Sequence, residues 1–85
     1  MTLEEYRKKF DQVDEQLLEL LAARMKISKE IAKYKKQHKF PVQDKRREAE
    51  VIDSRISKGK ELGLEDQKFI TELFKLIMKQ SRKSQ

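Results

Sequence analysis

Hydrophobic residues recur every three to four positions through the first 38 residues, the spacing at which they share one face of an α-helix. In heptad terms they fill the two inward positions over about five repeats. One position holds, in order, Leu3, Phe10, Leu17, Arg24, Ile31 and His38, and the other holds Tyr6, Val13, Leu20, Ile27 and Tyr34. Neither Gly nor Pro interrupts the segment, so the pattern predicts one helix that begins with a capping box at Thr2–Glu5 and ends at about Lys39.

A second, shorter helix is predicted after a break near residue 40. Pro41 disfavours a helical conformation at the residue before it, which ends the first helix. Asp44 is a suitable N-cap, and the segment that follows it carries helical periodicity to about Lys58.

Gly59 and Gly63 are predicted to bracket the next turn. Glu65 and Asp66 then open a third helix, because acidic residues are favoured at the positive end of the helix dipole. Its apolar residues at helical spacing are Phe69, Ile70, Leu73, Phe74, Ile77 and Met78. The pattern contains no strand, so the chain is predicted to be all-α, with three helices in a single domain at residues 1–85.

The first helix is too long for a compact chain of this size. About 37 residues at 1.5 Å each give a helix of roughly 55 Å. A compact domain of 85 residues has a radius of gyration near 12 Å and is about 30 Å across. Some of the apolar stripe must therefore be covered by another chain, and a two-fold homodimer is the simplest closed solution.

Polar residues continue the apolar faces of the predicted helices. Arg24 interrupts the stripe of the first helix, and Lys35 lies on nearly the same side. An unpaired buried guanidinium costs several kcal/mol, and no acidic residue follows on that stripe, so an anionic ligand is a candidate partner. Glu48 shares the inward face of the second helix, and Ser81 and Gln85 extend that of the third. Together they could bind a small molecule that carries carboxylate and hydroxyl groups.

Purely structural roles are also open for these residues. Arg24 can pair with a glutamate of a partner chain or set the helix register. Lys35 can lay its apolar stem along the seam with its ammonium in water. Glu48 can pair locally with Lys45, and the polar residues at the C-terminus can belong to a fraying helix end.

Composition limits the chemistry further. The chain has 21 Lys and Arg against 15 Asp and Glu, a net charge of +6, so it should attract anions. It lacks cysteine and has a single histidine, His38, which leaves little from which to build a thiolate or transition-metal site. We find no apolar run long enough for a membrane span and no signal-peptide pattern, so a cytoplasmic protein without membrane contact is expected.

An ordered set of short motifs resembles the all-helical class of chorismate mutases. The motifs are Leu3-x-x-x-Arg7, Val13-Asp14, Leu17-Leu18-x-Leu20-Leu21-x-x-Arg24, Ile31-Ala32-x-x-Lys35, Pro41-Val42-x-Asp44-x-x-Arg47-Glu48, Gly63-Leu64 and Ser81-x-x-x-Gln85. They cover essentially the whole chain with their spacing kept. The resemblance implies conversion of chorismate to prephenate, on the route to phenylalanine and tyrosine, without cofactor or metal. It also implies an intertwined homodimer of three-helix chains.

The same resemblance implies which groups bind the two substrate carboxylates. Arg24 would bind one of them, and Arg7 would reach across from the partner chain to bind the other. Ser81 would assist at a carboxylate, and Arg47 would lie beside the site and help to set its charge.

The remaining implied roles concern the ring hydroxyl and the bond that breaks. Glu48 and the backbone near Asp44 would hold the hydroxyl. Lys35 and Gln85 would donate hydrogen bonds to the ether oxygen, on which negative charge develops. A Claisen rearrangement needs no nucleophile or general base, so the lack of such a set is no objection.

Three other functions fit parts of the pattern. An isochorismate–pyruvate lyase on the same scaffold would use similar arginines and lysine, although Glu48, Ser81 and Gln85 favour the mutase. A basic helical dimer that binds nucleic acid predicts cations on an exposed face, whereas here acids are interspersed and key cations face inward. A structural coiled coil would leave Arg24 unexplained.

Overall fold

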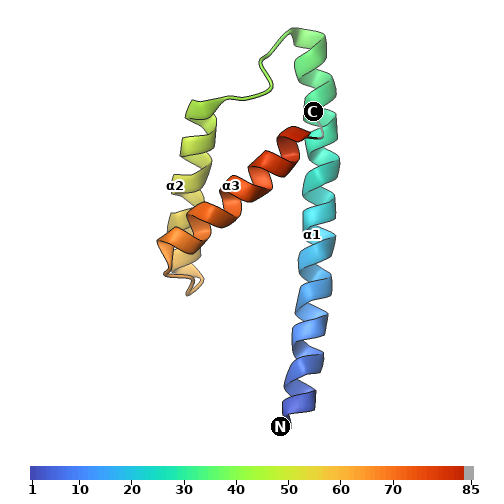
Figure 1. Ribbon diagram of the computed structural model, residues 1–85, viewed down its shortest axis with the longest axis vertical. Helices are drawn as coiled ribbons and strands as arrows, with labels where there is room; N and C mark the ends of the chain where they lie inside the picture. Colours follow the sequence, from blue (N-terminus) through green and yellow to red (C-terminus); the bar gives the residue numbers. More distant parts are fainter. Residues whose placement is uncertain (84–85) are drawn as a thin grey trace.

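The computed structural model describes residues 1–83, and all the regular structure in this range is α-helical. The helices are α1 (Leu3–His38), α2 (Lys45–Glu61) and α3 (Gln67–Lys83). The all-α prediction is therefore confirmed, and so is the order of one long helix followed by two shorter ones. In Figure 1, α3 crosses obliquely from α2 toward the C-terminal half of α1, while the N-terminal half of α1 extends beyond both.

The ends of α1 lie where the sequence predicts them. Thr2 is the N-cap, and its hydroxyl accepts a hydrogen bond from the backbone N–H of Glu5 at 3.2 Å. Lys39 takes a left-handed conformation with φ of 58°, and its N–H and that of Phe40 both donate to the carbonyl of Lys35. These bonds satisfy a carbonyl that would otherwise lack a partner at the helix end.

The end of α2 differs from the prediction. Asp44 is the N-cap as expected, with its carboxylate accepting from the N–H of Arg47 at 3.0 Å. The helix does not stop at Lys58, however, and Gly59 is a buried residue inside it rather than one side of a turn. A Cβ at Gly59 would lie 3.2 Å from the carbonyl oxygen of Leu64 and 3.5 Å from Ile70 Cγ1, so this glycine lets α3 approach closely. The turn glycine is Gly63, with φ of 86°.

The start of α3 is also shifted. Glu65 and Asp66 precede the helix instead of forming its first turn. The carboxylate of Asp66 accepts a hydrogen bond from the N–H of Phe69 at 3.1 Å, which is the bond that an N-cap residue makes. Asp66 therefore still acts at the positive end of α3, but from the position just before the helix rather than from within its first turn.

The helices of this chain enclose only a small apolar core. Helix α3 packs against both α2 and α1, and the buried hydrophobic residues within the described range are Val51, Ile70 and Met78. The apolar stripe of α1 stays uncovered, with Phe10 71% and Leu20 70% exposed. The molecule is 55 Å long with a radius of gyration of 15.9 Å, against about 12 Å for a compact chain of this length. No helix in residues 1–83 is both long and apolar enough to cross a membrane.

Candidate functional site

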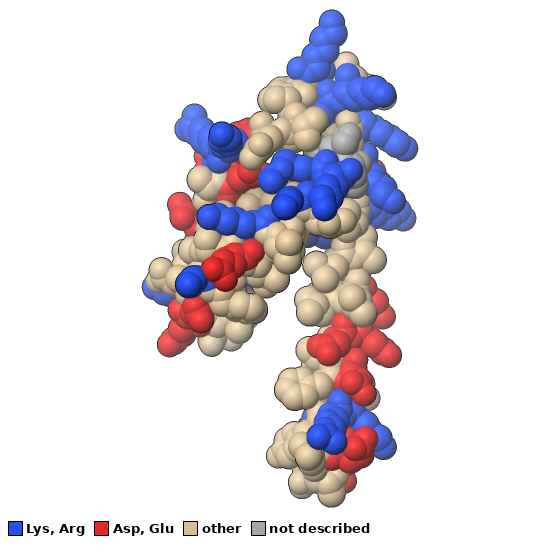
Figure 2. Space-filling view, in the orientation of Figure 1, with Lys and Arg blue, Asp and Glu red and all other residues tan. Residues whose placement is uncertain are grey.

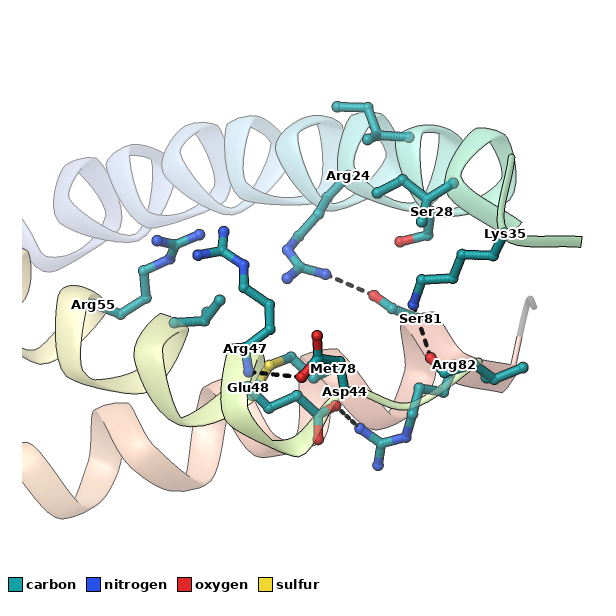
Figure 3. A pocket seen from close by; sticks show the side chains of 14 residues that line it. Arg24, Ser28, Lys35, Asp44, Arg47, Glu48, Arg55, Met78, Ser81 and Arg82 are labelled. Atoms are coloured by element: carbon teal, nitrogen blue, oxygen red, sulfur yellow. Dashed lines mark hydrogen bonds and ion pairs between the residues drawn. The ribbon is translucent and has the colours of Figure 1, made fainter. Parts of the chain in front are cut away.

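A cavity of about 270 Å³ lies where α1, α2 and α3 come together. The backbones of α1 and α2 stay apart, and side chains from all three helices and from the α1–α2 connection enclose the space between them (Figure 3). The lining residues are Arg24, Ile27, Ser28, Ile31, Lys35, Val42, Asp44, Arg47, Glu48, Val51, Arg55, Met78, Ser81 and Arg82.

Arg24 extends from α1 across the cavity toward the end of α3. Its Nη1 donates a hydrogen bond to the hydroxyl of Ser81 at 2.6 Å, and Ser81 is 93% buried. Burial lowers the pKa of the Arg24 guanidinium, and the positive charge of Arg55 lowers it further. Within the described residues no carboxylate pairs with Arg24, so its partner in this range is a neutral hydroxyl. A partly buried cation without a counter-ion is suited to bind an anion.

Lys35 enters the same cavity from the last turn of α1. Its ammonium donates to the carbonyl oxygen of Val42 at 2.9 Å, which ties the helix to the connection that follows it. This bond gives the Lys35 ammonium a backbone partner beside the cavity. The contact aims its ammonium toward the cavity interior, as Figure 3 shows.

Glu48 lies on the opposite wall, in the first turn of α2. Its carboxylate accepts from Nε2 of Gln43 at 3.1 Å and from the guanidinium of Arg82 in α3. The local pair with Lys45 that the sequence left open is therefore not formed. Its side chain is 22% exposed, so this carboxylate is shielded from solvent on most sides.

Asp44 and Arg47 complete the predicted set on this wall. Asp44 serves as the N-cap of α2, which holds the backbone of the α1–α2 connection at the cavity edge. The side chain of Arg47 is 64% exposed, with its Nη1 3.9 Å from a carboxylate oxygen of Glu50. Arg47 thus adds positive charge beside the cavity while remaining in contact with solvent.

Two of the eight predicted residues are not among the described residues that line the cavity. Arg7 is exposed near the start of α1, where its Nη1 lies 3.9 Å from a carboxylate oxygen of Glu4. Gln85 lies outside the described residues. The other six, brought together by the fold, are Arg24, Lys35, Asp44, Arg47, Glu48 and Ser81.

Comparison with known proteins identifies the scaffold. Residues 6–85 match the protein family described as chorismate mutase type II. The chain belongs to this family. It is 40% identical over 75 residues to a bifunctional chorismate mutase/prephenate dehydratase of Escherichia coli, covering 88% of this chain and 19% of that protein. It is 39% identical over 51 residues to a chorismate mutase of Methanocaldococcus jannaschii, covering 60% of this chain and 52% of that protein.

A third relative extends the same pattern. The bifunctional chorismate mutase/prephenate dehydratase of Aquifex aeolicus is 31% identical over 78 residues, which are 89% of this chain and 22% of that protein. The chain thus spans about a fifth of the length of its bifunctional relatives and about half of the archaeal one. No solved structure matches the chain.

The sequence did not single out three polar residues that line the cavity, Ser28, Arg55 and Arg82. Ser28 is four residues after Arg24, and Arg55 is four residues after Val51, so helical periodicity could have placed both on the cavity side. Arg55 also stacks over the ring of Phe74, 5.8 Å from its centroid. Arg82 is likewise four residues after Met78, but its pairing with Glu48 depends on where the end of α3 lies relative to α2.

The charges of the cavity favour an anionic ligand. Among residues 1–83, five cationic side chains line it against two carboxylates, which gives a formal charge of +3 from this part of the chain. Lys and Arg side chains also gather over the neighbouring surface, where α3 meets the C-terminal half of α1 (Figure 2). A concave site with an excess of one charge concentrates ligands of the opposite charge. The described residues hold no group of three or more His, Cys, Asp or Glu that could bind a metal ion.

Proposed function

We propose that this chain binds chorismate in the cavity and rearranges it to prephenate, a step toward phenylalanine and tyrosine. The observation that carries the proposal is the convergence of Arg24, Lys35 and Glu48 from two helices on one cationic cavity. These groups suit a substrate with two carboxylates, a ring hydroxyl and an ether oxygen. The family membership of the chain supports the same assignment.

The first task of the site is to hold the substrate in its compact reactive conformer. Arg24 would bind one carboxylate, and Ser81, already hydrogen-bonded to it, would steady the guanidinium in that position. Arg7 of a partner chain would bind the other carboxylate, and Arg47 would add positive charge nearby. Fixing both carboxylates accelerates a unimolecular rearrangement because the reacting atoms are held close in the required orientation.

The second task is to stabilise the negative charge that develops on the ether oxygen. Lys35 would donate to this oxygen, and Gln85 would supply a neutral amide donor beside it. An ammonium carries three N–H groups, so Lys35 can keep its bond to the Val42 carbonyl while it turns another toward the ligand. A preorganised donor of this kind acts most strongly in the transition state.

The third task is to orient the substrate ring. Glu48 would accept a hydrogen bond from the ring hydroxyl, assisted by the backbone near Asp44. The N-cap bond between Asp44 and the N–H of Arg47 keeps this backbone in place. No step of this mechanism requires a cofactor or a metal ion.

We further infer that the working unit is an intertwined homodimer. The exposed stripe of α1 includes Tyr6, Phe10 and Leu17, and burying a large apolar side chain contributes about 1.5–3 kcal/mol. A second copy of α1 packed along this stripe would cover it and would carry Arg7 toward the cavity of its partner. Folding and association would then be coupled.

Product analysis tests the proposed activity. Purified protein is incubated separately with chorismate and with isochorismate, and prephenate and pyruvate are both measured. We expect prephenate from chorismate without release of pyruvate. Pyruvate released from isochorismate, with chorismate left unchanged, would instead assign the chain to the lyase that shares this scaffold.

A further inference from the structure

The ion pair between Arg82 and Glu48 joins the last turn of α3 to the first turn of α2. Both side chains line the cavity, with 28% and 22% of their surface exposed. By contrast, the Arg46–Glu50 pair on the outer side of α2 has side chains that are 93% and 55% exposed. Shielded pairs are screened by salt much less than exposed ones, so the pair at the cavity should be the stronger of the two.

The two contacts of Glu48 fix its carboxylate from both sides. Gln43, in the α1–α2 connection, donates to Oε1 at 3.1 Å, and Arg82 donates to Oε2. An ionised carboxylate can accept about four hydrogen bonds, so both oxygens keep capacity for a ligand hydroxyl. Figure 3 shows Arg82 reaching Glu48 from α3. The carboxylate is therefore oriented before any ligand enters.

We propose that Arg82 is a positioning residue, which holds the Glu48 carboxylate where it accepts a hydrogen bond from the ring hydroxyl of the substrate. This inference rests on the proposed mutase function and extends it to a residue that has no assigned role there. An acceptor oriented in advance does not have to be reorganised during the reaction, which is how fixed polar groups contribute to catalysis. Without Arg82, Glu48 would lose its charge-assisted hydrogen bond and would be free to rotate.

The pair is not needed to hold α2 against α3. The two helices already share the buried side chains of Val51, Ile70 and Met78. At the far end of α2, Gly59 allows the close approach of Ile70. These contacts remain when Arg82 is replaced, so loss of Arg82 should affect activity more than folding.

The first test compares Arg82→Met with Lys83→Met. Both residues lie in the last turn of α3, so the two changes remove the same charge from the same helix end, but Lys83 is exposed and does not line the cavity. We expect Arg82→Met to lower kcat/KM by about 10- to 100-fold, the usual effect of losing a hydrogen bond to a charged group. Lys83→Met should stay within about twofold of wild type. Arg82→Lys should recover part of the loss, because it keeps the charge without the planar fork.

A double-mutant cycle with Glu48→Gln separates positioning from a general structural effect. If Arg82 acts through Glu48, Arg82→Met should reduce kcat/KM by less than about threefold in the Glu48→Gln background. The inference would be overturned if the losses of kcat/KM caused by Arg82→Met and Glu48→Gln multiplied in the double variant. It would also be overturned if Arg82→Met were as active as Lys83→Met. Neither result would affect the proposed mutase function. A wild-type protein that leaves chorismate unchanged would contradict the proposed function, and the role of Arg82 would fall with it. Circular dichroism of each variant checks that the fold is retained.

Discussion

Mixed dimers of two inactive variants would show directly whether Arg7 acts across the subunit interface. Arg7 precedes Arg24 by 17 residues on the same helix, a separation of about 25 Å along the axis. Its side chain is 64% exposed, and it lies beside Glu4 rather than at the cavity. Arg7 therefore does not serve the cavity of its own chain, and any role in binding must be played in that of a partner.

The perturbation is a pair of single changes, Arg7→Ala in one protein and Lys35→Ala in the other. Each homodimer lacks one essential group in both of its sites. In a mixed dimer, one cavity has the intact Lys35 of one chain and the intact Arg7 of the other, while the second cavity lacks both groups. Random reassociation makes half of the dimers mixed, each with one working site, so about a quarter of the wild-type specific activity should return.

The assay is chorismate consumption after the two variants are unfolded together in urea and refolded. The control is the same pair refolded separately and assayed at once after mixing, before the subunits exchange. Recovery near a quarter in the first sample alone would support a shared site. No recovery after verified subunit exchange, or an Arg7→Ala homodimer with wild-type activity, would refute the reasoning.

Three further changes test individual groups of the site. Arg24→Ala should abolish most activity yet leave the free energy of unfolding unchanged or raised, because it removes a partly buried cation repelled by Arg55. A strongly lowered midpoint of urea unfolding would contradict this. Arg55→Met should raise KM for the dianionic substrate several-fold more than the matched change of the exposed Arg46, and equal effects would exclude Arg55 from binding. Gln85→Glu should be weak at neutral pH and gain kcat/KM as acid protonates the new carboxyl into a donor, whereas a flat profile like that of wild type would remove Gln85 from the site.

The helices were predictable from the sequence because local signals determine most of their ends. Thr2, Asp44 and Pro41 act through their own neighbours, and the structure confirms the boundaries that they predict. Gly59 was misinterpreted because glycine has two uses. Glycine can end a helix, or it can lie inside a helix where a neighbouring element packs too closely for a side chain. Only the position of Ile70 in the folded chain shows that Gly59 has the second use.

The candidate site was predictable to the extent that polar residues lie on otherwise apolar helix faces. Arg24, Glu48 and Ser81 broke the hydrophobic pattern, and the structure brings all three to the cavity. The partners of these residues were not predictable. Whether Glu48 pairs with Lys45 or with Arg82 depends on how α3 crosses α2, which no local pattern encodes.

The most direct test of the whole account is the rate at which the wild-type protein and Lys35→Ala consume chorismate, followed by its ultraviolet absorbance. Lys35 is held at the cavity by the Val42 carbonyl, and we expect it to interact most strongly when the ether oxygen gains charge. Loss of one such donor typically lowers kcat by about 100- to 1,000-fold, with a smaller change in KM. The account predicts rapid consumption by wild type and a loss of this size in Lys35→Ala. A wild type that does not consume chorismate, or a folded Lys35→Ala variant with near-wild-type kcat, would contradict it.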